Sequence, residues 1–329
     1  MLALSDIILS IVPPRDALAT AKRISEVCQS AVEARKTKKG AGSDSVVFID
    51  LNAVSPKTVA KIDASFSTPA IPNTPPPTQS LTRRLSRSLS FAGAAQSSKT
   101  ESEISPIKIK FLDGAIIGSP PSRRKAKADS ADDHADDSDS AWKKPSLPLS
   151  GPYKENLPED LLGVLDAKFI SDKLGTASAL KACFASLTKG FTALSILSYT
   201  TAATCGVLPE LQSHLHEFMP GLAQRAEGGL TGMPPKAYRW VDEMREIGQT
   251  FKSSGGLKFG AEMFDQVAEV YRFVAEDTAL GAEKVGKRKR GTTIEDVTEL
   301  MEEGVHKKLQ KKPAKDEKLE LAWRGSWGL

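Results

Sequence analysis

Short, continuous apolar runs alternate with helical segments over the first part of the chain. Such runs occupy residues 7–12, 46–51 and 107–116, and their length and content of β-branched residues are typical of buried parallel strands. A segment with the apolar period of a helix follows each of the first two runs. The order strand, helix, strand, helix, strand is that of βαβ units, so the pattern predicts a parallel sheet.

From Gly175 onward the apolar positions have the period of an α-helix. They recur at spacings of three and four as far as Cys205, without an internal proline, and further helices are predicted over 234–252 and 261–279. We expect the large apolar side chains to form the buried side of the long first helix. These residues are Leu180, Phe184, Leu187, Phe191, Leu194 and Leu197. The predicted fold class is a partial, Rossmann-like α/β parallel sheet followed by an all-α C-terminal domain.

Two segments break the alternation. Residues 68–105 are rich in Pro, Ser and Thr, and residues 122–147 pass from a basic run into an acidic one. Neither buries enough apolar surface to offset the entropy of ordering, so we expect both to be disordered. The charged stretch 282–329 has few apolar anchors and is expected to be a tail.

Composition narrows the class of protein. A net charge of +4 does not indicate nucleic-acid binding, and no window is expected to reach the apolar length of a membrane span. Cys28, Cys183 and Cys205 have neither metal-ligand spacing nor the even number of a disulfide framework. We therefore expect no metal and a cytoplasmic location.

Four segments together resemble one enzyme family. They read ILSIVPPRDA, FIDLNAVSPKT, FLDGAIIGSPP and GTASALKACFASLTKG. They are similar to loops and a long helix of the 6-phosphogluconate/3-hydroxyisobutyrate (β-hydroxyacid) dehydrogenases, in the branch with a phosphogluconate dehydrogenase C-terminal-like domain. The resemblance implies NAD(P)-dependent oxidation of a small or phosphorylated 3-hydroxy acid. It also implies a Rossmann domain joined to a helical domain, which forms a homodimer.

The chain departs from the family pattern at several positions. Ala185 stands where the family has an Asn, and Ile117 stands where its second loop has a Ser. No G-x-G-x-x-G follows a strand upstream, so we expect a chain that is truncated relative to the family and binds NAD or NADP weakly or not at all. The alternative function is a non-catalytic homologue or incomplete gene model that keeps the helical dimerisation domain.

Lys181 is the candidate catalytic residue. The resemblance aligns it with the family's lysine, and a desolvated lysine can exchange a proton with the substrate hydroxyl. An exposed helix lysine is the alternative. Asn52, after the second strand, is a candidate for the cofactor and Ser55 for the substrate, although Ser55-Pro56 is also a common helix start.

The remaining candidates also come from loops and the long helix. Val12, Pro13 and Pro14 are expected on the cofactor side. The backbone of Gly118 and Ser119 can meet an anionic substrate or form an ordinary turn. Lys189 can meet a phosphate or carboxylate, or be solvated.

The expected domain map has four parts. Residues 1–121 form the partial NAD(P)-binding unit, 122–147 a linker, 148–281 the helical domain and 282–329 the tail.

Overall fold

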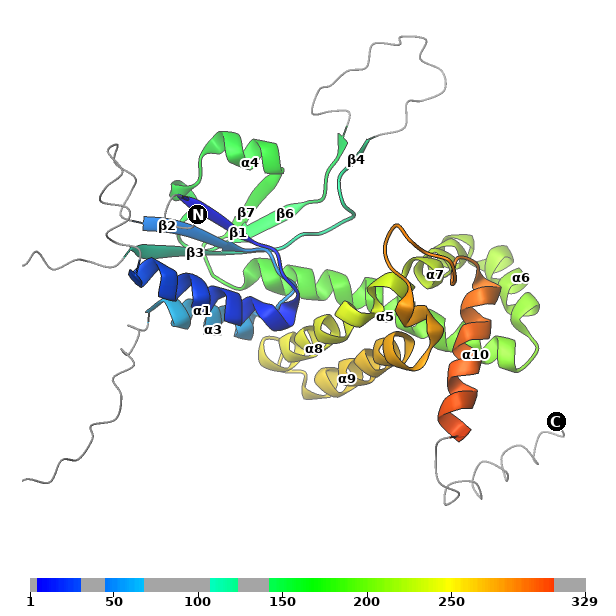
Figure 1. Ribbon diagram of the computed structural model, residues 1–329. Helices are drawn as coiled ribbons and strands as arrows, with labels where there is room; N and C mark the ends of the chain where they lie inside the picture. Colours follow the sequence, from blue (N-terminus) through cyan, green and yellow to red (C-terminus); the bar gives the residue numbers. More distant parts are fainter. Residues whose placement is uncertain (1–4, 31–44, 68–106, 124–141, 311–329) are drawn as a thin grey trace, which may run out of the picture.

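The computed structural model describes residues 5–30, 45–67, 107–123 and 142–310 of the 329-residue chain. In this part of the chain an α/β unit is joined by one long helix to a helical domain (Figure 1). This arrangement is the fold class predicted from the sequence.

The α/β unit contains a five-stranded sheet with the order β1-β2-β3-β6-β7. Its strands are β1 (Ile7–Ser10), β2 (Ser45–Asp50), β3 (Lys108–Gly114), β6 (Leu147–Ser150) and β7 (Ala167–Ser171). The three predicted strands are confirmed, and they are parallel to one another. Strand β6 is antiparallel to β3, and β7 is parallel to β6. These last two strands were not predicted because they are too short to show a clear apolar period.

Helices cover both faces of the sheet. Helices α1 (Pro14–Ser30) and α3 (Pro56–Ser67) lie on one face, and α4 (Glu159–Leu165) lies on the other (Figure 1). Along β2 the side chains alternate between the two faces: Phe48 packs in the cluster with α1 and α3, and Ile49 in the opposite cluster. Because β1, β2 and β3 are parallel, their carboxyl ends meet at one edge of the sheet.

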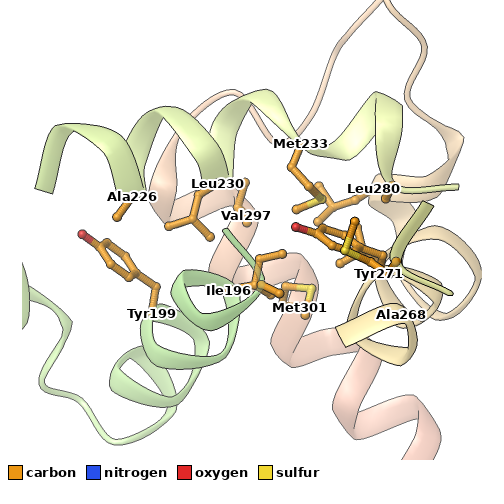
Figure 2. Close-up of a cluster of buried hydrophobic side chains, with 14 of the residues drawn as sticks. Ile196, Tyr199, Ala226, Leu230, Met233, Ala268, Tyr271, Leu280, Val297 and Met301 are labelled. Atoms are coloured by element: carbon orange, nitrogen blue, oxygen red, sulfur yellow. The ribbon is translucent and has the colours of Figure 1, made fainter. Parts of the chain in front are cut away.

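The helical domain surrounds α5 (Thr176–Thr204), which leads into it from the sheet (Figure 1). The other helices are α6 (Leu208–Phe218), α7 (Pro220–Gly232), α8 (Ala237–Ser253), α9 (Lys258–Arg272) and α10 (Ile294–Gln310). Short 3-10 turns span Lys154–Asn156, Pro234–Lys236 and Ala279–Ala282, and a π-helical turn spans Phe273–Asp277. Figure 2 shows Ile196 of α5, Leu230 of α7 and Tyr271 of α9 in the shared core.

Helix α10 corrects the expectation that 282–329 is an unanchored tail. Val297 and Met301 point from α10 into the core between α5 and α7 (Figure 2). Ile294 and Leu300 are buried with them. The apolar period was obscured in the sequence by the many charged residues between these anchors.

The buried side of α5 is not the one predicted. Small residues such as Ala185, Gly190 and Ala193 face the helical core together with Ile196. Five of the six large side chains expected inside are exposed: Leu180, Phe184, Leu187, Leu194 and Leu197, here called the outer face of α5. The sixth, Phe191, is partly buried and packs against the helical core. Helices that pack closely favour small residues between them, and α5 is apolar on both sides. Its periodicity therefore did not show which side is buried.

The expected disordered segments fall largely outside the described residues. Residues 68–105 do so entirely. The ends of 122–147 do not fit the expectation: Ser122–Arg123 (β4) pairs in antiparallel fashion with Trp142–Lys143 (β5), and Leu147 already belongs to β6.

One of the described helices, α5, has the length and composition of a membrane span. The expectation that no window reaches that apolar length is therefore wrong. Of its apolar window, 39% is buried inside the protein. Its exposed apolar residues are those of the outer face.

Candidate functional site

A small recess lies where the α/β unit meets the helical domain. Its lining comes from the loop after β2, from α5 and from α8. The lining residues are Ala53, Val54, Lys181, Ala182, Ala185, Glu243, Glu246 and Ile247. Lys181, Glu243 and Glu246 contribute to this lining, which is otherwise apolar.

Lys181 lies in this recess and is not a solvated lysine. Its Nζ donates a hydrogen bond of 2.5 Å to the carbonyl oxygen of Ile116, which follows β3. Burial, and then the positive charge of Arg239, lowers the pKa of Lys181. Leu180 and Phe184, which were expected on the buried side of the helix near Lys181, are exposed. The neighbours that bury Lys181 come from the strand-end loops and α8.

The start of α5 is fixed by a buried carboxyl group. Asp113 of β3 accepts hydrogen bonds from the backbone N–H of Ser178 at 3.0 Å and from its hydroxyl at 2.6 Å. The hydroxyl of Ser150 also donates to Asp113, at 2.9 Å, and accepts from the N–H of Ala177 at 3.0 Å. Asp113 thus positions the helix turn that precedes Lys181. This role was not predicted, although Asp113 lies within a predicted strand, near its carboxyl end.

The side chain of Asn52 forms hydrogen bonds within the protein. Its side-chain oxygen accepts from the N–H of Val12 at 2.6 Å, and its amide donates to Asp50 and to Ser10 Oγ, the latter at 3.2 Å. Asn52 is buried and holds the loop after β1 against the end of β2. Of the other cofactor candidates, Pro13 is exposed and Pro14 is buried at the start of α1.

Ser55 caps α3, as the alternative interpretation allowed. Its hydroxyl accepts a 3.2 Å hydrogen bond from the N–H of Thr58. The N–H of Ser55 donates to Glu246 Oε2 at 2.6 Å, and Thr58 Oγ1 donates to the same oxygen at 2.9 Å. Glu246 belongs to α8, so a carboxylate of the helical domain occupies the start of α3. No local pattern in the sequence indicated this contact.

Gly118 and Ser119 do not line the recess, although they closely follow Ile116, whose carbonyl accepts from Lys181. Gly118 has φ of +121°, which favours glycine, and follows the bridge between Ile117 and Ser146. Ser119 is exposed beside Pro120. The structure thus brings Lys181 and the loop after β2 together and leaves this turn outside.

Lys189 is buried, so the solvated alternative does not hold. It forms an ion pair with Glu243, and the two side chains are 15% and 8% exposed. Its Nζ also lies 4.9 Å from the ring centroid of Trp240, and Tyr271 donates a 2.6 Å hydrogen bond to its carbonyl oxygen. Burial and the charge of Lys181 lower the pKa of Lys189, while the Glu243 carboxylate opposes that effect.

A nicotinamide dinucleotide needs N–H donors for its pyrophosphate, and helix starts commonly supply them. At α1, Pro14 has no N–H, and the N–H of Asp16 donates to the carbonyl of Pro13. At α3 the N–H of Ser55 is bonded to Glu246.

At α5 the first amides bond to Ser150 and Asp113. Within the described residues these three helix starts do not fit a pyrophosphate, and we assign it to none of them.

The comparisons with known proteins agree with the sequence resemblance. Residues 202–274 match the model of a domain of unknown function, DUF1932, which is the C-terminal domain of 3-hydroxyisobutyrate dehydrogenase-like proteins. The predicted resemblance is thereby confirmed. No curated protein matches the chain.

Solved structures show similar folds. A conserved hypothetical protein from Sinorhizobium meliloti 1021 is 20% identical, with a TM-score of 0.52 over 92% of this chain and 76% of that one. The 3-hydroxyisobutyrate dehydrogenase of Mycobacterium tuberculosis, with L-serine, is 10% identical, with a TM-score of 0.48 over 92% of this chain and 80% of that one. A 3-hydroxyisobutyrate dehydrogenase from Salmonella typhimurium is 13% identical, with a TM-score of 0.41 over 83% and 80%. The first of these likenesses shows the fold alone.

Proposed function

We propose that this chain is an oxidoreductase-like protein of the β-hydroxyacid dehydrogenase type. Its substrate class is a small or phosphorylated 3-hydroxy acid, bound in the recess beside Lys181, and NAD or NADP is the cofactor of that class. The observation that carries the proposal is the buried ammonium group of Lys181, at the point where α5, α8 and the end of β3 meet.

Lys181 is the proton carrier in this proposal. Burial favours its neutral form, which can accept a proton from a substrate hydroxyl, and its charged form can return one. The carbonyl of Ile116 orients the amine, and Asp113 fixes the helix turn before it. Ala185, in the recess lining, offers no hydrogen bond, so the substrate must be oriented by other groups.

Lys189 supports the proposed recognition of an anionic group. Lys189 lies on α5 about two turns after Lys181, and the charge of Lys181 helps to lower the pKa of Lys189. Ser55, Gly118 and Ser119 remain proposed substrate contacts through their loops. Val12, Pro13, Pro14 and Asn52 remain proposed neighbours of the cofactor.

The second candidate function is a non-catalytic homologue. It is favoured by the helix starts of α1, α3 and α5, whose donors are engaged by Pro13, Glu246 and Asp113. Such a protein would keep the helical dimerisation domain without oxidising a 3-hydroxy acid.

We also propose that the protein forms a homodimer. The proposal is supported by the exposed large side chains on the outer face of α5. A cytoplasmic location, and the absence of nucleic-acid and membrane partners, remain predictions.

The Lys181 substitution tests the catalytic role. With 3-hydroxyisobutyrate and NAD or NADP at one fixed, subsaturating concentration, Lys181→Met should lower the rate of oxidation by about 10²–10⁴-fold, the usual effect of removing a positioned acid or base. The readout is the absorbance of the reduced nicotinamide. Lys173→Met, at an exposed lysine shortly before α5, is the matched control and should keep full turnover.

Two results separate the candidate functions. Full turnover in Lys181→Met contradicts the role of this lysine. Calorimetric binding of 3-hydroxyisobutyrate to the wild type, without turnover by either cofactor, supports the non-catalytic homologue.

A further inference from the structure

A buried ion pair borders the recess. Lys189 of α5 and Glu243 of α8 form it, and their side chains are 15% and 8% exposed. Glu243 is also part of the recess lining, as is Lys181. The pair therefore connects the recess with the interior of the helical domain.

Aromatic contacts within the helical domain hold Lys189 in place. Its Nζ lies 4.9 Å from the ring centroid of Trp240, and Tyr271 donates a 2.6 Å hydrogen bond to its carbonyl oxygen. The rings of Trp240 and Tyr271 meet edge to face, with their centroids 5.1 Å apart. The face of an aromatic ring attracts an ammonium group, so the contact with Trp240 favours the charged form of Lys189.

The two lysines of α5 are close enough to repel each other. Lys189 follows Lys181 by eight residues, which is about two turns of the helix. Burial, and then the charge of Lys181, lowers the pKa of Lys189. Water and salt screen such repulsion only weakly between buried groups. A charged Lys189 without its carboxylate would in the same way disfavour the charged form of Lys181.

The other charged groups near Lys181 come from α8 and the turn before it. Glu246 lines the recess, but its carboxylate already accepts two hydrogen bonds from the start of α3. Arg239 is exposed, so water weakens its effect on Lys181, and Lys236, immediately before α8, is half-buried. Glu243 is therefore the buried carboxylate whose pairing decides the charge around Lys181.

We propose that Glu243 is a positioning residue that acts through Lys181: its carboxylate neutralises the buried Lys189, so that Lys181 gains and loses its proton without a second unpaired cation of α5 beside it. Stability alone does not account for the pair, because the desolvation of both groups offsets much of their attraction. The catalytic meaning of the proposal rests on the proposed function, in which Lys181 carries a proton. The coupling of the charges does not, because it can be measured on the lysines themselves.

Two single substitutions should move Lys181 in opposite directions. Glu243→Gln leaves the ammonium group of Lys189 unpaired, so the pKa of Lys181 should fall by about one pH unit or more. Lys189→Met leaves the Glu243 carboxylate to stabilise the charged form of Lys181, so the pKa of Lys181 should rise by about the same amount. The double variant, which carries neither charge, should give a value between the two. Loss of local structure would instead expose Lys181 to water and raise its pKa in both single variants.

Trace labelling with acetic anhydride between about pH 6 and pH 11 measures these shifts without any turnover. The reagent acylates the neutral amine, and mass spectrometry of the peptide that contains Lys181 gives the rate at each pH. The exposed Lys173 is the internal reference. Glu262→Gln, at an exposed carboxylate on α9, is the control and should leave the titration of Lys181 unchanged. Thermal unfolding shows whether each variant is folded.

The pH dependence of turnover is the second measurement. If Lys181 carries the proton, the rate of hydroxy acid oxidation should keep its dependence on one ionisation, which moves to lower pH in Glu243→Gln and to higher pH in Lys189→Met.

Each single variant tests the proposal alone, so the failure of one to fold leaves the other. An unchanged pKa of Lys181, or shifts of the same sign in both variants, overturns the proposal. Opposite shifts in the labelling experiment, without turnover by the wild type or any variant, support the coupling and contradict the proposed function instead.

Discussion

Two buried carboxyl groups lie next to each other at the ends of neighbouring strands. Asp50 of β2 and Asp113 of β3 are register partners, and both are 0% exposed. Burial, with a contribution from the charge of Asp113, raises the pKa of Asp50 to about 7, although hydrogen bonds from Asn52 oppose the shift. Burial also raises the pKa of Asp113. Among the described residues, the Oδ2 oxygen of Asp50 has no hydrogen-bond partner.

The raised pKa of Asp50 predicts stability that falls with rising pH. The folded protein keeps this proton up to about pH 7, whereas the unfolded chain loses it near 3.8. The contribution is therefore fully present below about pH 4, is lost as the pH rises to about 7, and stays lost above that. In Asp50→Asn the side chain can still accept from Asn52 but no longer titrates. The fall in the free energy of unfolding between about pH 4 and pH 7 should therefore be smaller than in the wild type, by on the order of 1–4 kcal/mol.

Urea unfolding of both proteins at several pH values from 4 to 8 measures the difference. The remaining titrating groups are common to both and cancel in the comparison. Parallel pH dependences for the wild type and Asp50→Asn would mean that this proton is not held.

The residue scale also shows what the sequence can predict. Lys181 was identified because its motif is continuous in the sequence. The capping role of Ser55 was predicted because helix starts have a local signal. Glu246 was missed because it contacts Ser55 across 191 residues of sequence, and no local pattern records such a contact.

At the scale of elements, helices and strands with a clear period were predicted and short ones were not. The long helix α5 was placed within a residue of its observed ends. Its buried side was misassigned because Leu187 and Leu194 looked like core anchors, whereas Ala185 and Ala193 pack inward. Hydrophobicity shows that a side is apolar, and only the neighbouring helices decide whether it is covered.

The outer face of α5 gives a prediction about self-association. Leu187 and Leu194 are 77% and 62% exposed, so replacing them should cost little stability in the monomer. If this face forms the proposed homodimer, Leu187→Asp with Leu194→Asp should weaken the dimer at least about 100-fold, since it places charges in an apolar interface. Sedimentation velocity over a range of concentrations measures the effect.

A matched variant controls for exposed apolar residues in general. Val285→Asp makes the same kind of change at an apolar residue that is 74% exposed and lies outside α5. It should leave the association unchanged. A wild-type chain that stays monomeric at high concentration, or a dimer unaffected by the α5 changes, contradicts the proposal.

At the scale of the whole molecule, the two domains are joined by more than the long helix. Glu246 of α8 binds the start of α3, and Lys181 of α5 binds the loop after β3. The recess exists only because these contacts bring the domains together. Such an arrangement was predicted in outline from the resemblance, but its contacts depend on the folded chain.

The last prediction concerns the nicotinamide cofactor. Titration of the chain with NADPH should show no saturable binding tighter than about 1 mM, whereas a well-formed site would bind in the micromolar range. The reason is the competition at the helix starts. The N–H of Ser55 already bonds to Glu246, and that of Ser178 bonds to Asp113. An incoming pyrophosphate must displace a carboxylate that the fold holds in place, and it gains little net hydrogen bonding by doing so.

Glu246→Ala tests this reason directly. It uncovers the N–H of Ser55 and the hydroxyl of Thr58 at the start of α3. If the engaged donors limit binding, the variant should bind NADPH several-fold more tightly than the wild type, because an anion near a helix start is favoured. Glu262→Ala, at an exposed carboxylate on α9, should have no such effect. Micromolar binding by the wild type would show that the pyrophosphate uses donors other than these helix starts, and the dehydrogenase interpretation would then be favoured over the non-catalytic one.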